Sequence, residues 1–309
     1  MTLTSQPRIR PKALSVITLI ASLALICIFI PFTDTEVSAA EQTSVKVDGQ
    51  AVVFPDTQPT VSQGRTLVPL RPIVEAMGAD VQWDSDNRVA HIAMEGQAEL
   101  SVPVDYQYVQ LDTQGESAAI KIDVPAQVLH GRTMVPLRVI GESLGYRVNW
   151  DSQTSTAAYV KTDETQQTFQ SYTVDGDIEK LHPYELDVFW SVNEKRASAS
   201  VQPLALHVDL SLVAREKSKD MLDNGYFDHT SPTYGTPFEM MTEFNLSYRA
   251  AGENIAAGQR SPEEVMNGWM NSPGHRQNIE SESFTHIGVG FVSGSTGYRN
   301  YWTQMFMTP

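Results

Sequence analysis

Three short polar segments near the C-terminal end contain the residues of this chain best suited to chemistry. They cover residues 228–232, 252–255 and 272–276, and they contribute His229, Glu253 and His275. Each of these residues has Ser, Thr, Asn, Pro or Gly close by, which are residues that form turns. If the fold brings the segments together, two imidazoles and one carboxylate make a small polar site that binds a metal ion or moves a proton.

Two kinds of chemistry suit this set of side chains. Two neutral imidazoles ligate Zn²⁺ or another divalent cation, with Glu253 as a third ligand or as the base for a bound water. Around a bound peptide, the same three groups act instead by general acid–base catalysis. A third interpretation is structural: each histidine pins its own loop through hydrogen bonds. Whether the protein is an enzyme therefore stays open at this stage.

A set of helices and strands must position these three segments. Apolar spacing predicts a helix around 186–193 and a second helix over 210–223, with Asp209 as its N-cap and Gly225 at its end. Further helices are predicted over 238–244, from Ser261 through Trp269, and for one turn from Ser272, which places His275 near a helix start. Strands are predicted over 252–257, 287–292 and 301–307. Together these elements predict an α/β/α sandwich with Trp269 and Trp302 in its core.

Length and charge narrow the class of protein. At 309 residues the chain suits two or three domains, and its net charge of −15 argues against nucleic acid as a partner. The patterns of a nucleophile elbow, of a His-Glu-x-x-His zinc helix and of a phosphate loop do not occur in it. Standard hydrolase and nucleotide-binding machinery is therefore unsupported.

The first 39 residues have the layout of an export signal. Arg8, Arg10 and Lys12 precede an apolar run over 13–32, and small residues suited to cleavage follow at 37–39. The alternative is an uncleaved anchor, because about 20 apolar residues also span a bilayer. The only cysteine, Cys27, leaves with a cleaved signal, so the mature chain would have neither a disulfide nor a cysteine nucleophile. We expect a secreted protein, with association to the cell wall or membrane left open.

An internal repeat occupies the first half of the remaining chain. The sequence Gly-Arg-Thr-Leu-Val-Pro-Leu-Arg at 64–71 recurs as Gly-Arg-Thr-Met-Val-Pro-Leu-Arg at 131–138, and the match continues to Trp83-Asp84 and Trp150-Asp151. Each copy has the pattern strand, helix, strand, and residues 44–160 therefore form one duplicated α+β unit. Within each copy the arginine and a glutamate four residues later are expected to form a helical ion pair, and no catalytic set occurs here.

This duplicated unit resembles the copper amine oxidase N-terminal-like domain of exported bacterial proteins. The Gly-Arg-Thr-x-Val-Pro-Leu-Arg…Glu-x-x-Gly…Val-x-Trp-Asp pattern carries the resemblance in both copies. The resemblance implies a stalk or adhesive domain, and no cluster of copper ligands is visible in the sequence. We therefore expect no copper site in it. Residues 161–181 turn polar and are predicted to be a linker to the C-terminal domain, 182–309.

The C-terminal domain resembles the cysteine-free bacterial branch of the CAP superfamily, also called the SCP domain. Over about residues 184–307 the resemblance is carried by Asn193-Glu194-x-Arg196, Phe227-x-His229-x-Ser231-Pro232, Gly252-Glu253-Asn254-Ile255-Ala256 and Trp269-Met270-Asn271-Ser272-Pro273-Gly274-His275-Arg276, with further matches over 214–221, 284–290 and 301–304. Among the matched positions over 214–221 are Lys217 and Asp220.

The CAP resemblance implies a cleft that holds two histidines and two glutamates. His229, Glu253 and His275 match three of these positions, whereas the second glutamate falls on Ser272. The missing carboxylate leaves a triad and places any activity of four-residue members in doubt. Ser272, His286, Tyr301 and Gln304 are secondary candidates for the cleft.

The sequence thus predicts an α+β protein in which a duplicated stalk-like domain presents a CAP domain. Its function would be to bind a cell-wall or extracellular ligand, whether peptide, lipid or glycan, with a divalent metal as an optional participant. One alternative is an extracellular hydrolase, acting on peptides or the cell wall, that uses Glu253 with His229 and His275. The other is a non-catalytic envelope adhesin. A membrane partner is expected only if the signal is not cleaved.

Overall fold

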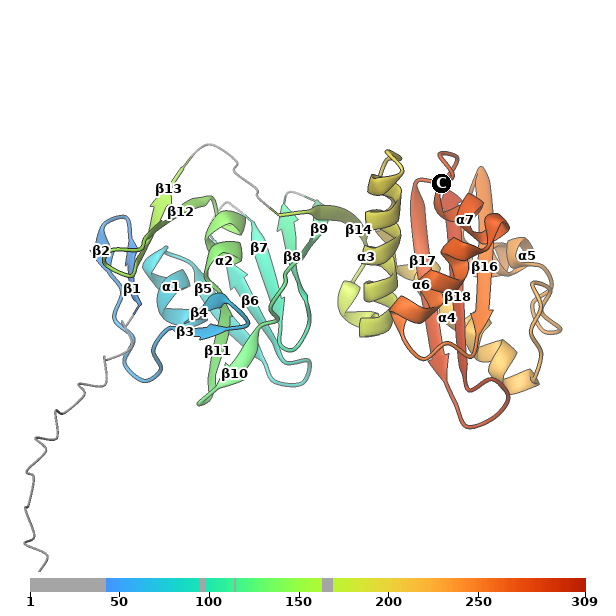
Figure 1. The fold of residues 1–309 in the computed structure, drawn as a ribbon, viewed down its shortest axis with the longest axis horizontal. Coiled ribbons are helices and arrows are strands. Elements are labelled where there is room, and N and C mark those ends of the chain that lie inside the picture. The colour runs from blue at the N-terminus through green and yellow to red at the C-terminus, as the bar shows by residue number, and fades with distance from the viewer. Residues whose placement is uncertain (1–42, 95–97, 114, 163–168) are drawn as a thin grey trace, which may run out of the picture. The chain divides into compact units, whose positions relative to one another are not determined.

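The computed structural model describes residues 43–94, 98–113, 115–162 and 169–309, in which helices and strands mix as an α+β fold (Figure 1). The predicted signal, 1–39, lies outside these residues, and so does the part of the predicted linker over 163–168. Among the described residues, no helix is long and apolar enough to cross a membrane.

The duplicated half is built mainly from strands, with one short helix in each copy. Its elements are β1 (Ser44–Val47), β2 (Gln50–Ala51), β3 (Thr60–Ser62), β4 (Arg65–Pro69), α1 (Leu70–Ala76), β5 (Asp80–Asp84), β6 (Val89–Ala93), β7 (Glu99–Pro103), β8 (Tyr108–Thr113), β9 (Glu116–Lys121), β10 (Gln127–Leu129), β11 (Arg132–Pro136), α2 (Leu137–Ser143), β12 (Tyr146–Asp151) and β13 (Thr156–Lys161). The strand–helix–strand prediction is confirmed twice, as β4–α1–β5 and as β11–α2–β12.

The two copies are related by an approximate twofold axis between β4 and β11. These strands pair antiparallel with Val68 opposite Val135, which are equivalent positions of the repeat. Ion pairs cross between the copies in a reciprocal way, as Arg65 with Asp123 and Arg132 with Asp56. Each arginine therefore reaches an aspartate that belongs to the other copy.

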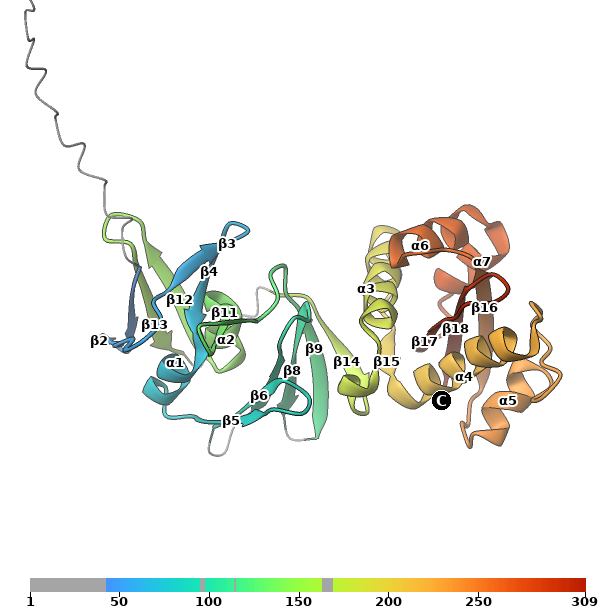
Figure 2. The same ribbon diagram turned by 90° about the horizontal axis from the view of Figure 1, so that it is seen from below.

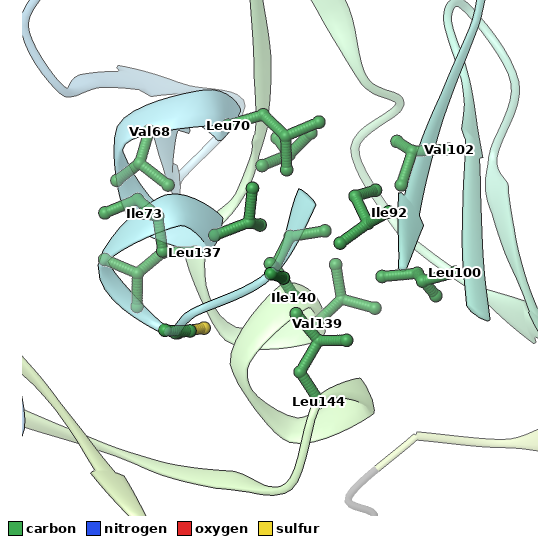
Figure 3. Close-up of a cluster of buried hydrophobic side chains, with 14 of the residues drawn as sticks. Val68, Leu70, Ile73, Ile92, Leu100, Val102, Leu137, Val139, Ile140 and Leu144 are labelled. Carbon is green, nitrogen blue, oxygen red and sulfur yellow. The ribbon is translucent and has the colours of Figure 1, made fainter. Parts of the chain in front are cut away.

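Apolar side chains from both copies meet in one core. Figure 3 shows Ile73 of α1, Ile140 of α2 and Ile92 of β6 among the buried side chains of this cluster. The predicted ion pairs within the two helices are confirmed, since Arg71 lies 3.3 Å from Glu75 and Arg138 lies 3.7 Å from Glu142.

The C-terminal half forms the predicted sandwich. Its elements are β14 (Ser171–Asp175), a 3₁₀ turn (Ile178–Lys180), α3 (Pro183–Ser198), β15 (Ala205–His207), α4 (Val208–Asn224), α5 (Pro237–Glu243), β16 (Ala250–Ala257), α6 (Pro262–Asn271), α7 (Pro273–Ile279), β17 (His286–Ser293) and β18 (Asn300–Thr308). Four strands follow the order β16-β18-β17-β15. In Figure 2, α3, α6 and α7 cover one face of these strands, and α4 and α5 cover the other.

Alternation along β18 divides the side chains between the two layers. Trp302 and Phe306 belong to the core beneath α3, α6 and α7, whereas Met305 and Met307 pack against α4 and α5. Trp269 and Trp302 are both buried, as predicted. The side chains of neighbouring residues on one strand therefore lie on opposite faces of the sheet. The same alternation on β16 determines which face its polar side chains occupy.

Helix α4 lies so close to β17 that two glycines are required there. A Cβ added to Gly290 would lie 2.0 Å from the Arg215 backbone nitrogen, and one added to Gly288 would lie 2.3 Å from the Leu210 carbonyl carbon. Backbone atoms of a packed helix cannot move aside as a flexible side chain can. The Gly-Val-Gly sequence of β17 thus sets the distance between the helix layer and the sheet.

Several local predictions differ from the structure. The helix predicted to start at Asp209 instead has His207 as its N-cap, whose Nδ1 accepts a hydrogen bond from the Leu210 backbone. At α6 the sequence pattern Ser261-Pro262-Glu263-Glu264 predicts a capping box, but the Glu264 carboxylate accepts from the Arg260 backbone and so does not complete it. The predicted linker contains β14, which pairs with β9 and β15. A polar segment becomes a strand here because two neighbouring strands supply its hydrogen-bond partners.

Candidate functional site

The loop that carries His229 is held in place by α4. The helix ends at Gly225, whose left-handed backbone (φ 67°) turns the chain back along the helix. Buried Lys217 then donates from its Nζ to the backbone oxygens of Asp228 and His229, at 2.9 and 2.8 Å. The lysine therefore fixes the main chain at the histidine itself.

A second anchor for the same loop is Asp220, one turn further along α4. Its carboxylate accepts hydrogen bonds from the side chains of four residues of the turn: Asn224, Tyr226, Ser231 and Thr233. Burial acts to raise the pKa of Asp220, but these hydrogen bonds outweigh it and leave the pKa below its usual value. An ionised carboxylate is thus a structural part of the loop.

Glu253 enters the site from the sheet. It lies on β16 directly opposite Met305, so its side chain is on the face that α4 and α5 cover. Its Oε1 is 2.6 Å from Nδ1 of His229, and its side chain is only 2% exposed, against 55% for His229. The carboxylate therefore lies behind the imidazole, and the ring leaves Nε2 for contact with a ligand.

Burial and hydrogen bonding change the proton affinities of this pair. Burial raises the pKa of Glu253, although His229 and the charge of Lys217 act against this. The hydrogen bond to Glu253 raises the pKa of His229. The second oxygen of Glu253, Oε2, is buried and accepts no hydrogen bond from the described residues. A buried oxygen of this kind requires a partner from outside the chain, such as a water or a ligand group.

An amide network holds the main chain at His275. It is the third residue of α7, and its backbone oxygen accepts from Nδ2 of the buried Asn254, at 3.0 Å. The same amide donates to Oε1 of Gln304, and Asn278 donates to the Asn254 Oδ1. Asn254 thus ties α7 to the strand that carries Glu253.

The environment of His275 favours its neutral form. Burial lowers the pKa of His275, and the nearby charge of His229 lowers it further. The pKa values of the two imidazoles are therefore shifted in opposite directions, so that His229 keeps its proton to higher pH than His275 does.

The secondary candidates lie in different places. Ser272 connects α6 to α7 next to His275, and Gln304 is a fully buried partner of Asn254. Tyr301 packs in a small core with Met221 and Ile255. His286 lies two strands away from β16, where its Nε2 is 3.0 Å from Asp175 and its ring is 6.0 Å from His207. The structure therefore does not join Tyr301 or His286 to the triad.

Lys217, Asp220 and Asn254 are positioning residues to which sequence reasoning assigned no role. A signal for two of them was present, because Lys217 and Asp220 fall on the face of α4 that carries Val213, Ala214 and Met221. Charged side chains on the apolar face of a helix are buried at a cost unless they have partners. Their position alone thus indicated a polar network beneath the helix.

The metal prediction finds limited support in the donor set. Among the described residues, no group of three or more His, Cys, Asp or Glu side chains is arranged to hold a metal ion. One oxygen of Glu253 is occupied by His229, which leaves two imidazoles as available ligands. A protein zinc site ordinarily has three or four ligands from the chain. The residues as placed do not fit such a centre, and a divalent cation stays a prediction.

The substitution Glu253→Gln is expected to lower the pKa of His229 towards its ordinary value. The glutamine would keep an oxygen that accepts from Nδ1 but would lose the charge that favours the imidazolium. The raised pKa contributes stability below the ordinary histidine pKa, and this contribution is lost as pH rises through the folded-state pKa. An NMR titration of the His229 ring signals checks the shift. A pKa of His229 that is the same in both proteins would contradict the assigned pair.

Comparison with known proteins identifies both halves of the chain. Residues 46–159 match the family model described as copper amine oxidase N-terminal domain, and residues 191–306 match that of the cysteine-rich secretory protein family, CAP. The chain therefore carries a copper amine oxidase N-terminal domain followed by a CAP domain. Both resemblances drawn from the sequence motifs are confirmed.

Two proteins of Bacillus subtilis (strain 168) are similar to parts of the chain. The uncharacterized protein YkwD is 54% identical over 125 residues, which are 40% of this chain and 47% of YkwD. The uncharacterized membrane protein YlbC is 38% identical over 95 residues, which are 31% of this chain and 26% of YlbC. The chain thus spans less than half the length of either relative.

Comparison with solved structures finds similarity to two proteins of other bacteria, among others. An extracellular protein containing a SCP domain from Bacillus anthracis has 22% identity and a TM-score of 0.38, with 82% of this chain and 89% of that chain covered. A cysteine-rich secretory protein from Staphylococcus aureus has 14% identity and a TM-score of 0.33, with 81% and 96% covered.

Proposed function

We propose that this protein is exported and that its CAP domain binds a polar ligand at His229, Glu253 and His275. The observation that carries the proposal is the His229–Glu253 pair, in which a buried carboxylate orients an exposed imidazole. Export is supported by the basic, apolar and small-residue order of residues 8–39. The N-terminal domain would then act as a stalk that holds the CAP domain at the envelope.

The proton states of the site favour an amide as the group that is recognised. His229, with its raised pKa, offers an N–H donor that suits a carbonyl oxygen. His275, with its lowered pKa, offers a neutral ring nitrogen that accepts from an N–H. A peptide or an acylated amino sugar presents both groups together. Glu253 acts on such a ligand through His229, because the buried carboxylate lies behind the ring.

A peptide titration followed by NMR tests this function. In a library of short peptides, we expect at least one member to bind with a Kd on the order of 1 mM or below and to shift the ring signals of both His229 and His275. Replacing both histidines with alanine should abolish the binding. The matched control is His286→Ala, because that histidine lies two strands away beside Asp175. Ring signals that no peptide moves would contradict the proposal.

A hydrolase is the second candidate function. It is favoured because the pKa of His229 is raised and that of His275 is lowered, so one ring suits a proton donor and the other a base. Neutral His275 would take a proton from a water that attacks the peptide carbonyl, and protonated His229 would stabilise the developing oxyanion, with Glu253 holding its ring. His275 would then give the proton to the leaving nitrogen as the C–N bond breaks. Cleavage of library peptides that disappears in His275→Gln and in Glu253→Gln, with both variants folded, would support this version. Binding without cleavage in the wild-type protein would leave the ligand-binding function alone.

Zinc calorimetry at pH 7 addresses the metal prediction separately. Because Oε1 of Glu253 is taken by His229 and Oε2 is buried, the two imidazoles are the accessible ligands that the described residues offer at this site, and we expect no saturable zinc heat that the His229→Ala/His275→Ala variant removes. A saturable heat in the wild-type protein that is absent from the double variant would restore the metal prediction. It would also imply that the ligand or a water completes the coordination.

A further inference from the structure

A cavity lies in the N-terminal domain, apart from the histidine site. It has a volume of about 760 Å³ and is here called the Trp150 groove. The residues that line it come from both copies of the repeat: Gly64, Arg65, Thr66, Gln107, Lys121, Ile122, Asp123, Pro136, Leu137, Arg138, Val139, Val148, Trp150, Phe169 and Gln170.

The approximate twofold axis relates this groove to a smaller one. The counterpart, here called the Arg132 groove, has a volume of about 450 Å³ and is lined by Ala51, Val52, Val53, Pro55, Asp56, Thr57, Pro69, Arg71, Pro72, Glu75, Ala76 and Arg132. Asp56, Pro69 and Arg71 of this groove are the repeat equivalents of Asp123, Pro136 and Arg138. Arg65 and Arg132 exchange roles in the same way. The two grooves can therefore be compared position by position. Residues that differ between them distinguish the Trp150 groove from its counterpart.

The charges of the two grooves differ. In the Arg132 groove, Arg71 and Arg132 are balanced by Asp56 and Glu75, which both line it. In the Trp150 groove, three cations, Arg65, Lys121 and Arg138, face one acidic residue, Asp123. The equivalent of Glu75 is Glu142, whose side chain is 7% exposed against 55% for Glu75, and it does not line the groove. The residues that line the Trp150 groove thus include more cations than carboxylates, and the carboxylates that pair with Lys121 and Arg138, which are Glu194 and Glu142, lie outside the lining.

The second difference is an exposed indole. Trp150 lines the larger groove and is 46% exposed, whereas its equivalent Trp83, also exposed at 42%, lines neither groove. A large aromatic residue left half in solvent beside arginines offers a flat apolar platform next to cationic donors. The flat face suits a ring, and the guanidinium groups suit phosphate or carboxylate oxygens.

Each cation of the groove already has a carboxylate partner. Arg65 pairs with Asp123, and both side chains are more than half exposed. Lys121 lies 2.7 Å from Glu194, and Arg138 lies 3.7 Å from Glu142, whose side chain is only 7% exposed. An exposed ion pair such as that of Arg65 contributes little to stability because water screens it. A ligand anion that arrives at the groove therefore replaces Asp123 at Arg65 at little cost and adds to the carboxylate contacts of Lys121 and Arg138.

We propose that the Trp150 groove binds an anionic saccharide chain, with Trp150 stacking on a sugar ring and Arg65, Lys121 and Arg138 contacting its phosphate or carboxylate groups. This binding is independent of the histidine site. It would give the stalk domain a ligand of its own, and it would attach the exported chain to an acidic polymer.

Calorimetry with defined polymers on the whole chain tests the groove. The probes are an oligogalacturonate, which carries carboxylates, a phosphomannan fragment, which carries phosphates, a neutral malto-oligosaccharide and polyglutamate. We expect one or both anionic saccharides to bind and the neutral one not to bind. Trp150→Ala and Arg138→Gln should each weaken binding about tenfold or more. The repeat-equivalent controls, Trp83→Ala and Arg71→Gln, should leave the affinity unchanged.

The four probes distinguish specific binding of an anionic saccharide from general attraction of any polyanion. Binding of only the oligogalacturonate or only the phosphomannan identifies the anionic group and supports the proposal. Failure of both anionic saccharides to bind would overturn it, as would an equal loss in Trp83→Ala and Trp150→Ala. Polyglutamate that binds as tightly as the saccharides, without dependence on Trp150, would show attraction by charge alone and would also overturn it. Circular dichroism of each variant confirms that the exposed substitutions leave the fold intact.

Discussion

Replacing Gly290 with alanine is expected to lower the free energy of unfolding of the CAP domain by more than about 4 kcal/mol. The new Cβ would lie 2.0 Å from the Arg215 nitrogen and 2.4 Å from the Ala214 oxygen, and both of these are backbone atoms of α4. Relief of the clash requires the helix to move away from β17. That movement would open the core in which Val213 and Ala214 pack on Met305. Urea denaturation monitored by tryptophan fluorescence measures the change.

Gly268 provides the matched control for this substitution. It lies in α6 of the same domain, and a Cβ there would meet only the end of the Gln259 side chain, at 4.0 Å. Alanine in a helix interior is favoured over glycine, so Gly268→Ala should be neutral or stabilising by up to about 1 kcal/mol. A Gly290→Ala protein as stable as Gly268→Ala would show that α4 does not lie as close to the sheet as described.

The movement of α4 would also reach the histidine site, because Lys217 and Asp220 lie on the same helix. Both residues hold the loop of His229, whereas Glu253 is fixed to the sheet through β16. A shift between helix and sheet therefore changes the distance from His229 to Glu253. Helix α4 thus links the close packing at Gly290 to the distance between His229 and Glu253.

Local patterns in the sequence predict most of the elements correctly. The helix around Ile73 and the end of α4 at Gly225 each depend on residues close together in the chain, and the structure confirms them. The presence of His229 and Glu253 in one site is an expectation from the family resemblance. Its geometry, with the carboxylate behind the ring, depends on the register of β16 against β18, which no local pattern encodes.

The errors have a common physical origin in contacts distant along the chain. The strand β14 forms in a polar stretch because β9 and β15 supply its hydrogen bonds. The sequence suggests His286 for the cleft wall, but the strand order places it beside Asp175. Lys217 matches a family motif, yet its role depends on the way the His229 loop folds back over α4. In each of these cases, the structure depends on residues that are far away in the sequence.

Replacing Lys217 with methionine is expected to lower the free energy of unfolding by about 3 kcal/mol and to release the His229 loop. Methionine fills a similar volume, but it leaves the backbone oxygens of Asp228 and His229 without the donor that now lies 2.9 and 2.8 Å away. It also removes a charge that lowers the pKa of Glu253, so that pKa should rise further. Denaturation curves and an NMR titration of Glu253 measure the two effects.

Lys219→Met on the same helix is the matched control. Its ammonium group is exposed and pairs with Asp223 one turn away, so its loss should leave both the stability and the pKa of Glu253 unchanged. Peptide binding at His229 should fall in Lys217→Met even under conditions where the domain remains folded, because the imidazole loses its fixed position. If Lys217→Met behaves like Lys219→Met in all three measurements, the lysine has no positioning role, and the site must derive its order from Asp220 alone.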